Sequence, residues 1–324
     1  MSHIIVTAEL ILLCLWGAAS TTGAEPQPSL AVEVTNGTDN GASVVGDEVL
    51  LVLYEREKPI DSVKSKVNEK GRAVFENVPT GDHIRAVAKA KHQNMMFDSQ
   101  VISLAPGPNP LKASVKVFDV STDKSKLSVG MHHFIIKTLT DALRITEYMQ
   151  LKNASDKAIT SQVKDSNDRD IVLEVSLPAG FKDVACSSYF EEHALVITDQ
   201  GFYDTMAVPP GIHNAAFSYT LAIDGRAVDI GKKLSLPTSE FMLFSQVGDD
   251  RVRGLGSPIG QVTLSDGGSA EYYSYPDPKL GEEIRFQVVG FNPEKRNHTG
   301  LLVLCVVFAA VGTVIVRRIR AGSK

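Results

Sequence analysis

Histidine and cysteine are the residues of this sequence best suited to metal binding or to proton transfer near neutral pH. His132 and His133 are neighbours in a segment whose residue types favour a β-strand, so their rings should point to opposite faces. A Cys, His and Met set would suit copper, but the close spacing of these residues in copper proteins is missing. We therefore expect no metal and no cofactor. The residues that come nearest to a ligand set are His132, Cys186, His193 and His213.

Motifs of the common enzyme classes are missing from the sequence. It contains no Gly-x-Ser-x-Gly, no His-Glu-x-x-His and no phosphate-binding loop. The stretch from Asp165 to Asp170 resembles a calcium loop, but Arg169 stands where an oxygen ligand is needed, so a solvated turn is the better interpretation. We expect a protein that is not an enzyme. The least favoured alternative is a hydrolase whose loops bring His132 and His193 together with acidic neighbours.

Aromatic side chains offer the best candidate for a binding site. The densest cluster contains Tyr272, Tyr273 and Tyr275 and is followed by Pro276. Tyrosine rings stack on sugars and anchor protein interfaces, so this cluster could bind a glycan or a partner protein. The structural alternative is an edge strand that places one tyrosine in the core and is ended by the proline.

The two ends of the chain indicate where the protein is located. Residues 1–24 have a short apolar core and small residues before a cleavage position after Ala24, as in a secretory signal peptide, although no Lys or Arg precedes the core. Residues 300–316 are an uncharged run of 17 residues, followed by the basic tail 317–324. This pattern predicts one transmembrane helix with the C-terminus in the cytoplasm. The body would then face the periplasmic or extracellular side of the cell membrane.

Charge and cysteine content exclude some functions and one kind of cross-link for the body, the part of the chain between the two apolar ends. The net charge of −5 argues against nucleic-acid binding, which depends on basic patches. Of three cysteines, only Cys186 lies between the two apolar ends, so no disulfide can form within the body. A buried, unreactive thiol is the favoured interpretation of this cysteine. Three Asn-x-Ser/Thr triplets are interpreted as chance occurrences, and they begin at Asn36, Asn153 and Asn297.

The body shows the period-two pattern of β-strands almost throughout. Residues 28–121 contain about seven short apolar segments separated by turn signals, which predicts one sandwich, and Val49–Leu53 resembles a strand buried on both faces. Residues 122–292 continue the pattern as an immunoglobulin-like region, with an open question whether a second subdomain begins near residue 225. Residues 139–151 could form a helix, but strand is favoured. Residues 293–299 would be a short tether to the membrane.

One segment resembles a known family. The run from Asn68 to Gly81 contains the turn and strand residues that mark the carboxypeptidase regulatory-like domain, a transthyretin-like (prealbumin-like) β-sandwich. The matching residues are Gly71, Phe75, Val78, Pro79 and Gly81. The two glycines suit tight turns, and Phe75 and Val78 should face the core. The family often has an aromatic residue in the strand after this run, where the present sequence has His83 and Ile84. The resemblance implies a domain that binds or braces and has no peptidase activity of its own.

Together these observations predict an all-β protein with tandem β-sandwiches, prealbumin-like and then immunoglobulin-like, between a signal peptide and one membrane span. We expect a binding or scaffolding role, as an accessory of a membrane complex with a protein partner in the membrane or envelope. A carbohydrate-binding module, with a glycan as ligand, is the alternative.

Overall fold

The computed structural model describes residues 28–107, 110–246, 251–263 and 268–291. Within them every regular element is a β-strand, apart from two 3-10 turns at Lys124–Lys126 and Glu192–Ala194. The sheets are open and pack face to face, so the predicted all-β, sandwich-type fold is confirmed. None of the helical turns in these ranges is long and apolar enough to cross a membrane. The predicted signal peptide, tether, membrane span and basic tail lie outside the described residues.

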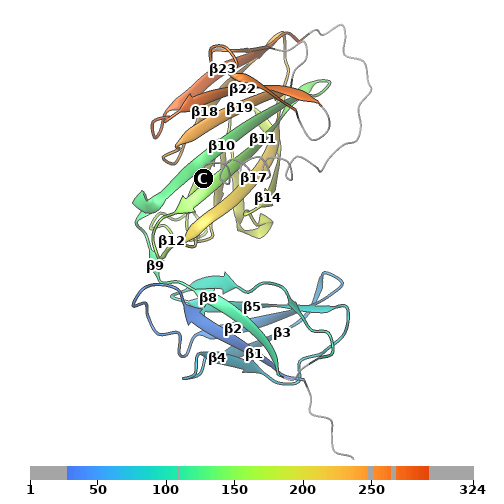
Figure 1. Cartoon of the computed structure of the whole chain (residues 1–324), viewed down its shortest axis with the longest axis vertical. Helices are drawn as coiled ribbons and strands as arrows, with labels where there is room; N and C mark the ends of the chain where they lie inside the picture. Colours follow the sequence, from blue (N-terminus) through green and yellow to red (C-terminus); the bar gives the residue numbers. More distant parts are fainter. Residues whose placement is uncertain (1–27, 108–109, 247–250, 264–267, 292–324) are drawn as a thin grey trace, which may run out of the picture.

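The first body holds two facing sheets and one hydrophobic core (Figure 1). One sheet has the order β4-β1-β8, with β1 and β8 parallel, and the other has the order β3-β2-β5-β6, with β7 also paired to β5. The bounds are β1 Leu30–Asn36, β2 Glu48–Glu55, β3 Lys58–Lys66, β4 Arg72–Phe75, β5 Ile84–His92, β6 Met95–Asp98, β7 Ile102–Ser103 and β8 Leu111–Val117. In β2 only Val49, Leu51 and Leu53 are buried, while Leu50 and Val52 are partly exposed. The expected burial on both faces is therefore wrong, because only one face of this sheet packs on the core.

The segment from Asn68 to Gly81 forms the turn and strand expected from the sequence. Asn68 closes the turn, since its carbonyl accepts a hydrogen bond from the Gly71 N–H. Its side-chain Oδ1 accepts hydrogen bonds from the backbone N–H groups of Lys70 and Arg72. Gly71 has a φ of 72°, in the left-handed region that favours glycine. Phe75 and Val78 are buried in the core. Gly81 does not have a positive φ, so the expectation that its turn dihedral angles favour glycine is wrong. A Cβ added at this position would lie 3.3 Å from the Ile84 side chain, which is a tight contact.

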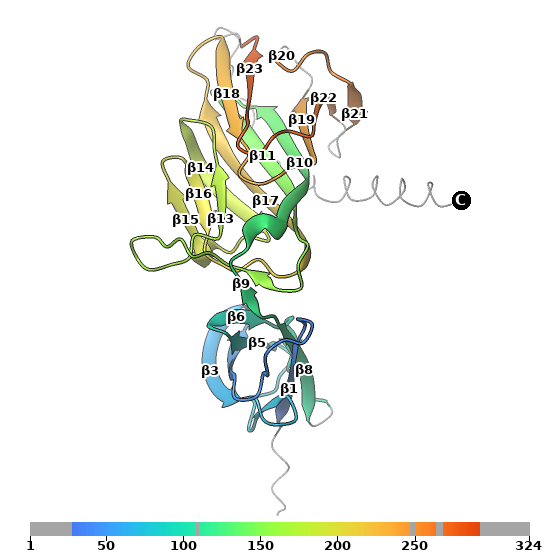
Figure 2. The same cartoon turned by 90° about the vertical axis from the view of Figure 1, so that its left-hand side faces the viewer.

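The second body is built on a seven-stranded sheet with the order β14-β17-β11-β10-β19-β22-β21. Two three-stranded sheets, β13-β16-β15 and β18-β23-β20, complete it, and all three sheets share one hydrophobic core (Figure 2). The bounds of the large sheet are β10 Leu127–Thr138, β11 Ala142–Asn153, β14 Phe181–Ser188, β17 Gly211–Ala222, β19 Glu240–Gln246, β21 Gly260–Thr263 and β22 Ser269–Pro276. Those of the smaller sheets are β13 Leu173–Ser176, β15 Leu195–Thr198, β16 Gly201–Asp204, β18 Ala227–Lys233, β20 Arg251–Arg253 and β23 Glu283–Val289.

The large sheet continues across residue 225. Strand β19 pairs in parallel with β10, so residues from the second half of the region extend the sheet formed by the first half. Strand β11 confirms the strand interpretation of residues 139–151. Its apolar residues point into the core at every second position or multiples of two, namely Leu143, Ile145, Met149 and Leu151. A helix would not place residues with a spacing of two on one face.

The two bodies meet at a joint where β9 (Val120–Ser121) pairs in parallel with β12 (Ala158–Ile159) (Figure 1). Thr38 Oγ1 of the first body donates to the carbonyl of Asp156 in the second at 2.8 Å, and it accepts from the backbone N–H of Asp119 at 3.0 Å. Hydrogen bonds of a polar side chain therefore link the two bodies, in addition to the covalent chain that runs through the joint.

Two of the Asn-x-Ser/Thr asparagines are structural. Asn36 Nδ2 donates to Asp119 Oδ1 at 2.7 Å in a network that also contains the buried ring of His92. Asn153 is 2% exposed, and its Nδ2 donates to the carbonyls of Lys157 and Val208. An amide nitrogen with two such bonds is not open to modification in the folded protein, which agrees with the interpretation of this triplet as chance.

Candidate functional site

A cluster of four polar side chains lies inside the second body, and we call it the polar centre: His132, Glu147, Tyr219 and Lys232. Glu147 is 0% exposed and is the hub. Its Oε2 lies 2.6 Å from His132 Nε2 and 2.7 Å from Lys232 Nζ, and its Oε1 accepts a 2.7 Å hydrogen bond from the Tyr219 hydroxyl. Three of these residues come from the large sheet, and Lys232 reaches across from β18. The polar centre therefore joins two facing sheets.

Strand alternation explains why these residues point inward. His132 lies in register with Met149 and with Phe241, and Glu147 with Phe217, on the inner face of the sheet. Lys232 also donates to the Ser176 carbonyl of β13 at 2.8 Å, and its Nζ lies 5.6 Å from the ring centre of Phe217. The lysine thus contacts all three sheets of the second body.

Burial and the neighbouring charges set the protonation of the polar centre. Burial alone would raise the pKa of Glu147, but Lys232 and His132 outweigh it and hold this pKa below the ordinary value. Burial lowers the pKa of His132, against the opposing effect of Glu147, so the ring is neutral and donates through Nε2. Burial and the glutamate raise the pKa of Tyr219 well above its usual value, so its hydroxyl keeps its proton.

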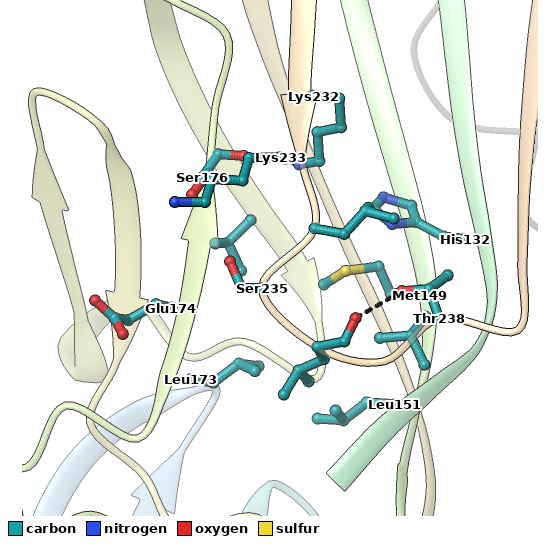
Figure 3. A pocket seen from close by; sticks show the side chains of 14 residues that line it. His132, Met149, Leu151, Leu173, Glu174, Ser176, Lys232, Lys233, Ser235 and Thr238 are labelled. Carbon is teal, nitrogen blue, oxygen red and sulfur yellow. Dashed lines mark hydrogen bonds between the residues drawn. The ribbon is translucent and has the colours of Figure 1, made fainter. Parts of the chain in front are cut away.

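A small cavity lies beside the polar centre. Its volume is about 20 Å³, enough for one water molecule. Figure 3 shows His132 and Lys232 among the side chains around it. Apolar groups such as Met149 and Leu151 form much of the rest of the wall. The cavity places His132 and Lys232 of the polar centre beside a space of about the size of one water molecule.

The residues considered as metal ligands lie in different surroundings. His132 belongs to the polar centre, His193 lies on an exposed 3-10 turn beside Glu191, and His213 Nε2 is 3.0 Å from the Pro209 carbonyl. Burial raises the pKa of the Cys186 thiol to about 11, which keeps it protonated. Across the part of the chain that the structure describes, no group of three or more His, Cys, Asp or Glu side chains could hold a metal ion.

The outer face of the large sheet carries a second cluster, which we call the aromatic row: Tyr148, His133, Phe244 and Tyr272. These residues come from four adjacent strands, β11, β10, β19 and β22. The ring of His133 lies 6.0 Å from that of Tyr148 and 5.0 Å from that of Phe244, which in turn lies 6.1 Å from that of Tyr272. The aromatic row therefore crosses the face of the sheet opposite to the polar centre.

His133 is the unusual member of the aromatic row. It is 4% exposed, and its Nε2 has no hydrogen-bond partner among the residues that the structure describes. Burial, with a smaller contribution from His132, lowers the pKa of His133 to about 4, so the ring is neutral at pH 7. A buried polar atom without a partner costs free energy, and such an atom in a native protein needs an explanation.

The three tyrosines singled out in the sequence separate in the structure. Only Tyr272 is on the outer face, where its ring packs against the position of Gly260 on the edge strand β21. Tyr273 is buried in the core, and Tyr275 packs against the core and donates to Glu282 Oε1 at 2.6 Å. Strand alternation forces this division, because neighbouring residues of β22 point to opposite faces.

Sequence reasoning did not select Glu147, Tyr219 and Lys232, or Tyr148 and Phe244. A usable signal exists for Glu147, which occupies an inward position between the apolar residues Ile145 and Met149. No comparable signal exists for the aromatic row, whose members become neighbours only through strand pairing. No family model matches the sequence, and no curated protein is significantly similar to it.

Proposed function

We propose that the protein is a non-catalytic binding or scaffolding protein that is anchored in the cell membrane and binds a partner protein. The aromatic row on the outer face of the large sheet is the observation that carries this proposal. In the proposed layout, residues 1–24 are a signal peptide and residues 300–316 span the membrane, with the sandwiches on the outer side. Aromatic residues grouped on one face are typical of the centre of a protein interface.

The composition of this face favours a protein over a sugar as the partner. Sugar-binding platforms present flat, coplanar rings, whereas the ring of His133 is inclined by 69° to Phe244 and by 39° to Tyr148. Met242 and Ile135 lie on the same face beside them, in register with His133 and Phe244 respectively. Flexible and branched apolar side chains of this kind pack against protein surfaces. We therefore assign the face to an apolar protein surface that also offers a hydrogen bond to His133 Nε2.

The finer assignment of the two bodies is also a proposal. The Asn68 turn, Gly71 with positive φ, and the buried Phe75 and Val78 support a carboxypeptidase regulatory-like, prealbumin-like sandwich for the first body. The second body would be an immunoglobulin-like sandwich widened by the strands β19, β22 and β21. In this arrangement the first body braces or extends the second, and the second carries the binding face.

The experiment is affinity purification of the full chain through a tag on its C-terminal end, after gentle solubilisation of native membranes. We expect a stoichiometric partner that is lost when Phe244→Ala and Tyr272→Ala are combined. The matched control is Tyr54→Ala, which removes a partly exposed aromatic residue from the first body. A partner retained at the same level by the double variant would refute the binding face, and so would the absence of any stoichiometric partner.

A glycan ligand is the alternative outcome of the same work. Tyr272 is the one residue of the sequence-selected cluster on the outer face, so it is the residue on which sugar binding would depend. Binding of the full chain to a glycan array that disappears in Tyr272→Ala and persists in Tyr275→Phe would replace the protein partner with a sugar.

A further inference from the structure

The polar centre holds an amine and a carboxylate in direct contact inside the second body. Lys232 Nζ lies 2.7 Å from Glu147 Oε2, and both side chains are 2% exposed or less. A nitrogen at this distance from one carboxylate oxygen lies roughly 3.5 Å from the carboxyl carbon, close enough for attack. An amine and a carboxyl group held together in a protein interior can form an amide.

We propose that Lys232 and Glu147 become joined in the folded protein by an amide bond between Nζ and Cδ, with the release of one water molecule. The product would be a covalent link between β18 and β11, and so between two facing sheets. This link would take the place of a disulfide: the described residues contain a single cysteine, Cys186.

The neighbouring groups are placed for each step of this reaction. A proton first passes from Nζ to Oε2 across the 2.7 Å contact, which leaves a neutral amine and a neutral acid. Nζ then attacks Cδ and forms the C–N bond, while negative charge develops on Oε1, where the Tyr219 hydroxyl donates a hydrogen bond. The surplus proton on nitrogen passes to Oε2, directly or through the ring of His132, which lies 2.6 Å from that oxygen.

The C–Oε2 bond then breaks, and Oε2, which now carries two protons, leaves as water. No oxidant or external reactant is needed, and the charge of the system is unchanged. The cavity of about 20 Å³ beside His132 and Lys232 has room for the released molecule (Figure 3). The Ser176 carbonyl, 2.8 Å from Nζ, orients the amine for the attack.

The driving force is the removal of two buried charges. An ion pair in a protein core loses the hydration of both groups, and its Coulomb attraction only partly replaces it. A neutral amide does not carry this cost, and its N–H and carbonyl can keep the contacts with Ser176 and Tyr219. Apolar side chains such as Phe217 and Met149 also surround the pair, which adds to the cost of keeping it charged.

Mass spectrometry of the full chain tests the proposal. The wild-type protein is denatured and its intact mass is compared with that of Lys232→Arg, which keeps the positive charge but cannot form the amide. We expect the wild type to be lighter by one water molecule beyond the difference due to the substitution. This comparison does not depend on how the ends of the chain are processed.

Peptide mapping gives a second readout that needs no variant. Trypsin does not cleave after an amide-linked lysine, so one branched peptide should contain both Glu147 and Lys232. Tyr219→Phe should slow formation of the link about 10²-fold, followed as water loss over time. Recovery of Glu147 and Lys232 in separate peptides, with a wild-type mass that still contains the water, would overturn the proposal and leave an ordinary ion pair.

Discussion

His132 and His133 are neighbours in the chain, yet they lie on opposite faces of the seven-stranded sheet and have opposite surroundings. On the inner face His132 is bonded to Glu147 in a network where each carboxylate oxygen has a partner. On the outer face His133 is almost as buried, but its Nε2 has no hydrogen-bond partner in the described part of the chain. The comparison separates two uses of a buried polar group. A buried group whose hydrogen bonds are all made within the protein stabilises the fold. A buried group near the surface without a hydrogen-bond partner indicates a site for a ligand.

The largest expected difference between the faces is in stability. Lys232→Ala leaves Glu147 buried without its cation, so the free energy of unfolding should fall by about 3–5 kcal/mol. The matched control is Lys233→Ala, the exposed neighbour on β18, which should change it by less than about 0.5 kcal/mol. Denaturant unfolding measures both. Similar losses for the two lysines would mean that the polar centre does not stabilise the sandwich.

We expect the free energy of unfolding to fall in acid because His133 becomes protonated when the protein unfolds. The folded protein holds the pKa of this residue at about 4, below its usual 6.5, so the unfolded chain binds a proton at a higher pH. Stability is therefore complete above pH 6.5 and is lost as the pH falls toward 4, by about 2–3 kcal/mol. His133→Phe should flatten this part of the curve of unfolding free energy against pH. An unchanged slope would show that His133 does not titrate as described.

The hydroxyl of Tyr219 should matter more than a surface hydroxyl. Tyr219→Phe removes the buried hydrogen bond that Glu147 Oε1 accepts from the tyrosine hydroxyl, and should cost about 1–3 kcal/mol. Tyr275→Phe removes a bond of similar length to Glu282 near the surface, and should cost less than about 1 kcal/mol. The two unfolding curves are compared at the same pH. Equal costs would contradict the contrast between buried and exposed hydrogen bonds.

The smallest expected effect is the most direct test of the outer face. At pH 8, His133→Phe should change the free energy of unfolding by less than about 1 kcal/mol, because it removes a polar atom that has no hydrogen-bond partner within the described ranges. The same variant should weaken capture of the proposed protein partner. A loss of stability above about 2 kcal/mol at this pH would instead assign His133 a structural role.

Local sequence pattern was enough to predict the strands and several turns. The alternation in β11 identified a strand where a helix was conceivable, and the turn at Asn68 and Gly71 followed from residue types with known backbone preferences. The same period of two predicted that His132 and His133 would point to opposite faces. Each of these features depends on residues only a few positions apart, so the sequence itself contains the physical information.

The sites were decided by tertiary structure. Lys232 reaches Glu147 only because β18 packs across the large sheet, and the aromatic row exists only because β19 pairs with β10 and β22 with β19. The tyrosine cluster is a further example. Tyr272 and Tyr273 lie on opposite faces of β22, and the ring of Tyr272 contacts that of Phe244 on the neighbouring strand. Strand order and register depend on packing between residues far apart in the chain. The sequence alone therefore determined which side chains of a strand point to the same face. The pairing of distant strands decided which of these side chains come into contact.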